Sequence, residues 1–482
     1  MPQRLTPLEV SILNQDTVRT PAHVGTVSVL KAQEKSDQAG FDHAGFDHAG
    51  LLALVAERIA YVPRYRQRVL SVPGRLAAPV WVDDARFDLA YHVRRAVLPG
   101  PGAWAQLEEF VARVMARRLD RSRALWELYL VEGLADGRSV VVGKTHLALV
   151  DNLDTVDLAQ VLIDSMAQPV LAPSGSPTQP ADGWLPLPEP TPVDLVGAAL
   201  WESAQDPEAA ANNLRGAVTS ALGLGLALGE VLVGGPTGGS QLVEDLLGGA
   251  PRPTSPLAGA PSGQCSWASA RLPLADITAV ATAHLVTAHD VVLATVTGAL
   301  RTWLLSRGEL VGSDQALRVL APVSVREAEG VLTSLGSEVT TQLVPLPIGT
   351  ERPLDRLREV AAATVASRDV ERAVGARELS AIPGFAPATL HILGARRAAE
   401  PACPPFDLLV TNVPGPQDAL FLGPVPLVET YPVVPLPPGQ LMSIALTSYA
   451  GGVFCGVLAD RVAVDDLTAL TEGLVAALAE LS

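Results

Sequence analysis

The chain has 482 residues and a formal net charge of −16, with 48% hydrophobic and 18% charged residues. This acidic balance argues against nucleic acid as a partner and against broad attachment to anionic lipid, because both need a basic surface. No uninterrupted apolar run reaches the roughly 18 residues of a spanning helix, so we expect no such helix. The length exceeds the size at which single cores stop growing, so we expect two domains.

Targeting, redox and metal signals are weak. The N-terminal residues show neither a long apolar core nor a cleavage site, so we expect no secretory signal and a cytoplasmic location. Cys265, Cys403 and Cys455 are odd in number and far apart, which suits reduced thiols better than disulfides. Without a CxxC pair or a histidine cluster, we expect no metal and no bound cofactor.

Hydrophobic periodicity predicts alternating helices and strands in residues 1–167, which we expect to form an N-terminal domain. The predicted elements are a helix at 51–59, a strand at 79–83, a helix at 106–118, and strands at 126–132 and 139–145. Such alternation favours an α/β layer structure.

A Pro/Gly-rich connection follows at residues 168–264, interrupted by a helical stretch at 193–203. Residues 265–482 then predict a second α/β domain. Its predicted strands are 266–272, 316–322, 408–412, 443–449 and 452–459, and its predicted helices are 290–306 and 464–481. Within the connection, the Gly/Ala/Leu-rich segment 216–235 is the best candidate for touching a membrane or lipid droplet, although we favour packing between the domains or a mobile crossover for it.

One short segment carries a site-like pattern. Residues 144–152 read KTHLALVDN, in which His146 precedes Leu147, and Asp151 precedes Asn152. In the pattern HHxxxDG, two histidines precede three variable residues and Asp-Gly. Residues 146–152 differ from this pattern only at Leu147 and Asn152. We interpret the segment as a degenerate form of that motif.

Further blocks occur in order along the chain, among them LTPLEVSIL, PAHVG, LDRSRALWELYLVEGL, HDVVLATVTGALRTWLLSRGEL, APVSVRE, TNVPGP and SIALTSYAGG. Together with the motif, they resemble the bacterial wax ester synthase/diacylglycerol acyltransferase (WS/DGAT) family over nearly the whole chain. The resemblance implies two chloramphenicol-acetyltransferase-like α/β domains with a tunnel at their interface.

In that family, acyl-CoA and a long-chain alcohol or diacylglycerol meet in the tunnel, and the second motif histidine is the general base. Leu147 occupies that position here and cannot accept a proton. Successive side chains of a strand point to opposite faces, so we expect His146 to face away from the tunnel and to be structural, and we assign Asp151 a structural role as well.

His289 is a weaker alternative base, since it stands before Asp290 where the family usually has Asn-Asp. The competing interpretation is that Asp290 caps the following helix and His289 fills the preceding turn. By family motif, we expect five residues to line the site: Asn152, Asp290, Ser337, Asn412 and Ser443.

Two functions therefore remain open. The first is an acyl-CoA-dependent O-acyltransferase that makes triacylglycerol or wax ester with reduced or altered activity. The second is an inactive paralogue that binds acyl chains or acyl-CoA, or that regulates an active relative. Transfer to an amine or to a thiol-carried substrate is a third and weaker hypothesis.

Overall fold

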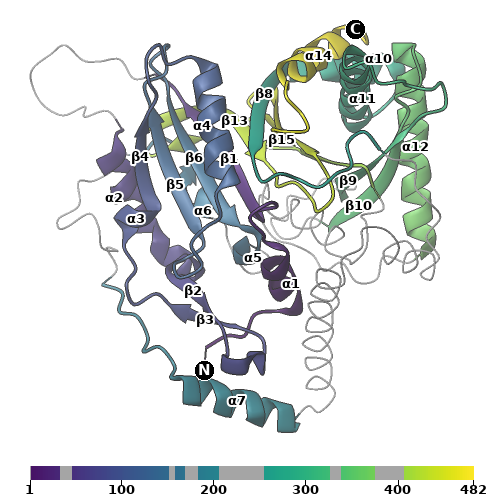
Figure 1. Cartoon of the computed structure of the whole chain (residues 1–482). Helices are drawn as coiled ribbons and strands as arrows, with labels where there is room; N and C mark the ends of the chain where they lie inside the picture. Colours follow the sequence, from purple (N-terminus) through teal and green to yellow (C-terminus); the bar gives the residue numbers. More distant parts are fainter. Residues whose placement is uncertain are drawn as a thin grey trace, which may run out of the picture.

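The computed structural model describes residues 2–32, 46–150, 158–168, 183–205, 255–325, 338–374 and 406–482. These residues form two large β-sheets, each with its own hydrophobic core, that lie side by side (Figure 1), and a separate two-stranded hairpin. The mixed α/β architecture confirms the expected fold class.

The first sheet has seven strands, and two of them come from late in the sequence. Its order is β4 (Val93–Val97), β5 (Trp126–Glu132), β6 (Ser139–His146), β1 (His23–Leu30), β13 (Val425–Val433), β12 (Phe421–Leu422) and β7 (Ile163–Asp164). Strand β13 pairs antiparallel with β1, with Gly25 opposite Val433. The C-terminal part of the chain therefore completes the N-terminal sheet.

The first part of the chain also contains seven helices in its described residues. They are α1 (Pro7–Gln15), α2 (His48–Arg58), α3 (Leu89–His92), α4 (Trp104–Ala116), α5 (Leu147–Val150), α6 (Leu158–Leu162) and α7 (Pro192–Gln205), with short 3₁₀ turns at Ile59–Tyr61, Pro63–Arg66 and Pro73–Arg75. Helix α7 packs Leu195 and Ala199 onto a small hairpin of β2 (Gln67–Leu70) and β3 (Val80–Asp83). The helix expected at 193–203 is confirmed, whereas the segment 216–235 lies outside the described residues.

The second sheet has six strands, in the order β10 (Glu338–Leu346), β9 (Leu317–Val325), β11 (Leu408–Val413), β14 (Met442–Tyr449), β15 (Gly452–Asp460) and β8 (Cys265–Pro273). Its helices are α10 (Leu274–His284), α11 (Ala288–Ser306), α12 (Pro353–Val374) and α14 (Thr468–Ala479). Every residue of α11 from Asp290 to Leu300 is buried. A helix covered on all sides is typical of a core, and α12 and α14 both pack against it.

In the described part of the chain, no single helix is both long and apolar enough to cross a membrane. The pair α10 and α11 passes that test only together, and the two helices meet at an angle of 106°.

Candidate active site

Residues 144–150 of the motif segment form the junction between a strand and a short helix. Strand β6 ends at His146, and α5 begins at Leu147. The neighbouring strand fixes this junction, because His23 pairs with His146, and the Leu147 N–H donates to the Ala22 carbonyl at 3.0 Å. Three predicted site residues lie outside the described residues: Asp151, Asn152 and Ser337.

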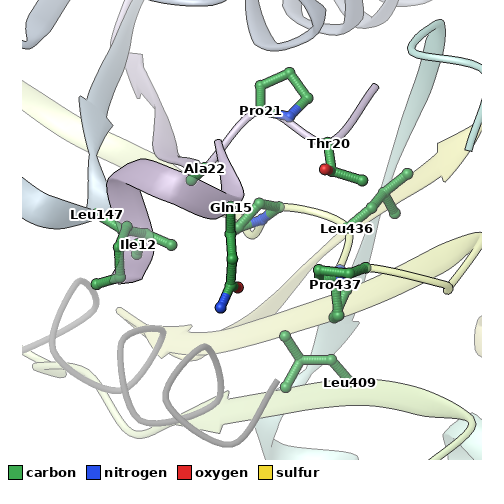
Figure 2. A pocket seen from close by; sticks show the side chains of 11 residues that line it. Ile12, Gln15, Thr20, Pro21, Ala22, Leu147, Leu409, Leu436 and Pro437 are labelled. Carbon is green, nitrogen blue, oxygen red and sulfur yellow. The ribbon is translucent and has the colours of Figure 1, made fainter. Parts of the chain in front are cut away.

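Leu147 lies in the wall of a pocket where the two sheets meet (Figure 2). Helix α1 and the segment that follows it form one side, and β11 with the proline-rich segment after β13 forms the other. The lining residues are Ile12, Gln15, Thr20, Pro21, Ala22, Leu147, Leu409, Pro435, Leu436, Pro437 and Pro438. The volume of about 40 Å³ suits a few water molecules, so an acyl chain can enter only if the lining moves.

The lining of this pocket is almost entirely apolar. Among the described residues that line it, only Gln15 and Thr20 carry polar side chains, and none is ionisable. Figure 2 shows the Gln15 side chain extending from α1 into the space between Leu147 and Leu409. The described lining can therefore orient a substrate by shape, and it offers no general base.

His146 lies next to Leu147 in sequence but belongs to a different environment. It is fully buried beside Asp16 and His23, and it does not line the pocket. Its Nδ1 accepts the Ala148 N–H at 3.1 Å, which puts the ring proton on Nε2, 3.5 Å from an Asp16 carboxylate oxygen. Burial lowers the pKa of His146, and Asp16 offsets only part of that effect, so the ring is neutral.

Asp16 is the centre of this buried polar cluster. One carboxylate oxygen accepts from Arg118 and Arg121, each at 2.8 Å, and the other accepts the Ala22 N–H at 3.1 Å. Burial alone would raise the pKa of Asp16, but His146 and the two arginines hold it far below its usual range. The ionised carboxylate therefore joins the end of α1 to the chain that enters β1, and so fixes Ala22 in the pocket wall.

Asp16, His23 and His146 bring one possible ligand atom each within 4.8 Å of one another. Their hydrogen bonds do not fit a metal ion. A metal on His146 Nε2 would put the ring proton on Nδ1, facing the Ala148 N–H, and His23 Nε2 likewise accepts the Leu119 N–H at 3.4 Å. Since the carboxylate is also shared between two guanidinium groups, we assign this cluster a structural role.

The remaining predicted site residues lie in the second part of the chain and do not line the pocket. His289, the second residue of α11, accepts at Nδ1 from the Asn412 side-chain amide at 3.2 Å. Asp290 accepts from the Thr287 N–H and from the Thr364 hydroxyl, at 2.9 and 2.6 Å, and forms a capping box with Thr287. Ser443 donates its hydroxyl to the Val434 carbonyl at 2.9 Å.

Sequence reasoning did not single out Asp16, His23 or Gln15. The first two form the cluster behind Leu147, and the third lines the pocket. The signal that could have found them is the antiparallel pairing of β1 with β6, which places His23 opposite His146. That pairing depends on strand register, which the local pattern of β1 does not reveal.

Two α/β layers, of which the first is completed by strands from the C-terminal part of the chain, meet at a pocket and form a two-domain fold of the chloramphenicol-acetyltransferase-like class. The structure of the wax ester synthase/diacylglycerol acyltransferase from Marinobacter aquaeolei VT8 is similar, with a TM-score of 0.66 and 23% sequence identity. The match covers 99% of this chain and 98% of that one. This likeness confirms the fold.

The sequence matches the wax ester synthase/diacylglycerol acyltransferase catalytic domain over residues 5–292 and the WS/DGAT C-terminal domain over residues 335–482. A Mycobacterium tuberculosis protein named probable diacylglycerol O-acyltransferase tgs1 is 32% identical over 480 residues, which cover 99% of this chain and 95% of that protein. Another from the same organism, named probable diacylglycerol O-acyltransferase tgs2, is 30% identical over 96% of this chain and 94% of its own length. The chain belongs to the WS/DGAT family.

Proposed function

We propose that this protein binds acyl-CoA and a long-chain alcohol or diacylglycerol where its two sheets meet, and that it transfers the acyl group at a reduced rate. Family membership and the names of the mycobacterial relatives support the acyl-transfer part. The observation that carries the reduced rate is Leu147, in the wall of a pocket where none of the described lining residues is ionisable.

The chemistry explains why this position matters. The acceptor hydroxyl oxygen attacks the thioester carbonyl, the carbon–sulfur bond breaks, and CoA leaves as a thiolate that takes up a proton. A general base removes the hydroxyl proton during attack, which is typically worth roughly 10²- to 10⁴-fold in rate. Without it, the proton must pass to water or to the departing thiolate, and only positioning of the two substrates by the pocket remains.

The direct test is product formation by the natural protein. Palmitoyl-CoA is supplied with either diacylglycerol or hexadecanol, and both CoA release and ester formation are followed against a heat-killed control. Slow ester formation above the control, with a preference for one acceptor, supports the proposal and identifies that acceptor. CoA release without ester would indicate hydrolysis and would contradict it.

The second candidate is an acyl-binding protein without transfer activity, which the same lack of an ionisable group among the described lining residues favours. Calorimetry of palmitoyl-CoA binding tests both candidates, because each of them requires the protein to bind acyl-CoA. Palmitoyl-CoA binding at micromolar concentration with no ester above the control supports the second candidate, whereas no binding heat at tens of micromolar contradicts both.

We also infer contact with an uncharged lipid surface, because the acceptors and products of the proposed reaction are insoluble in water. Helix α7 supports this inference, since Val193, Leu200 and Trp201 are 79%, 60% and 63% exposed. The helix has two carboxylates and no basic residue, which suits neutral better than anionic lipid. Flotation with a triacylglycerol emulsion should carry the protein, and Trp201→Glu should weaken it; equal flotation of both would contradict a role for α7.

A further inference from the structure

The most basic part of this acidic chain is the segment that joins α4 to β5. Residues 113–123 contain five arginines and one aspartate, in a chain with a net charge of −16. The arginines are Arg113, Arg117, Arg118, Arg121 and Arg123. Such a local reversal of charge attracts anions that the rest of the surface repels.

The carboxylates beneath this segment do not neutralise it. Asp16 is shared between Arg118 and Arg121, and Glu127 accepts from Arg94 at 3.0 Å. Lys144 adds a further cation below, where its ammonium donates to the carbonyls of Val114 and Arg117. Burial lowers the pKa of Lys144 to about 8, and the charges of Arg117 and Arg94 add to that effect.

The arginine side chains remain accessible on their outer side. Those of Arg118 and Arg121 are 33% and 40% exposed although both bind Asp16, and Arg113 and Arg117 are exposed as well. Arg113 and Arg117 are four positions apart at the end of α4, so they lie on the same side of the helix. Several guanidinium groups can therefore meet one multivalent anion.

The Asp16 carboxylate connects this basic surface to the pocket. Asp16, which holds Arg118 and Arg121, also accepts the N–H of Ala22, and Ala22 lines the pocket beside Leu147. Gln15, the residue before Asp16, lines the same pocket. An anion bound by the arginines would therefore lie beside the place where acyl transfer is proposed.

We propose that Arg113, Arg117, Arg118 and Arg121 bind the phosphate groups of the coenzyme A part of the acyl donor. This rests on the proposed function and extends it, because it gives the donor's nucleotide a site of its own outside the apolar pocket. Coenzyme A combines a 3′-phosphate and a diphosphate with a flexible pantetheine arm. Arginine suits such groups, since its fork of N–H donors pairs with phosphate oxygens.

The test uses adenosine 3′,5′-bisphosphate, which carries part of this phosphate chemistry but neither the pantetheine arm nor the acyl chain. Its binding to the full chain is measured by calorimetry at two salt concentrations. We expect binding that weakens with salt, and a loss of about tenfold or more in both Arg113→Glu and Arg117→Glu. Arg117 also donates to the Tyr129 hydroxyl, so its replacement could disturb the fold. The Arg113 variant tests the site without removing that contact.

Arg358→Glu is the matched control, since Arg358 is an exposed arginine on α12 beside Asp355. Equal weakening in this control, or no weakening in the two variants, would overturn the site. If palmitoyl-CoA binds but the bisphosphate does not, even at millimolar concentration, the site is wrong while the proposed function stands. If the bisphosphate binds through the arginines and palmitoyl-CoA binds no better, the site stands and the proposed function fails.

Discussion

At the scale of single residues, Leu147 and His146 are neighbours with different roles. Leu147 lines the pocket, whereas His146 is buried beside Asp16 with its proton on Nε2. A one-residue step at the end of a strand separates the two environments. His146 therefore fixes the backbone, and the proposed reduced rate rests on Leu147 at the position that lines the pocket.

The buried histidines predict how stability depends on pH. Burial, with Lys144 nearby, lowers the pKa of His23 well below 6.5, whereas an unfolded histidine titrates at about 6.5. The unfolded chain thus binds more protons below that pH, so the free energy of unfolding should fall as the pH drops below about 6.5. We expect urea unfolding of His23→Gln to show a shallower fall between about pH 6.5 and 5.

Glutamine at position 23 can still accept the Leu119 N–H, so the comparison isolates titration from a lost hydrogen bond. His284→Gln, at an exposed position on α10, is the control and should keep the natural slope. Parallel curves for His23→Gln and the natural protein would show that His23 is not the titrating group.

At the scale of helices and strands, the sequence predicted elements whose pattern is local. The strand expected at 126–132 is β5, and the helix expected at 290–306 is α11. Strands β1 and β13 were not predicted, because their partners are distant and β13 contains two prolines, which are unfavourable inside a strand. The candidate pocket depends on these same long-range pairings. The motif therefore predicted that Leu147 belongs to the site, but it did not predict the other residues that line the pocket.

The start of α11 gives a prediction at this scale. Thr287 accepts the Asp290 N–H at 3.1 Å, and Asp290 accepts in return from Thr287. Removing an N-cap hydroxyl typically costs about 1 kcal/mol, so Thr287→Ala should lower the free energy of unfolding by that amount. Thr282→Ala, within the neighbouring helix α10, should cost less; equal losses would show that the capping box contributes nothing particular.

At the scale of the whole molecule, β13 links the two sheets. It pairs with β1 in the first sheet and contacts β14 and β15 of the second. Glu108 of α4 adds a second link, because it accepts both the N–H and the hydroxyl of Ser269 in β8, each at 2.9 Å. We therefore expect the two sheets to unfold together, in one cooperative transition.

Gly456 of β15 tests this coupling. A Cβ built there would lie 2.1 Å from the carbonyl oxygen of Pro432 in β13, so Gly456→Ala must push the two strands apart. We expect a loss of about 1–3 kcal/mol in urea unfolding and separate transitions for the two parts. Gly197→Ala is the opposite case, because nothing lies within 4 Å of that site on α7, and it should stabilise by about 1 kcal/mol. A single unshifted transition in Gly456→Ala would contradict the coupling.

The most direct test of the account compares Leu147→His with the natural protein in acyl transfer from palmitoyl-CoA to its preferred acceptor. Leu147 faces the pocket, so a histidine there should restore a general base and raise kcat/KM by roughly 10²- to 10⁴-fold. Adding His289→Asn to that variant should change the rate little, because His289 is paired with Asn412 and does not line the pocket. Equal rates for Leu147→His and an active natural protein would contradict the account.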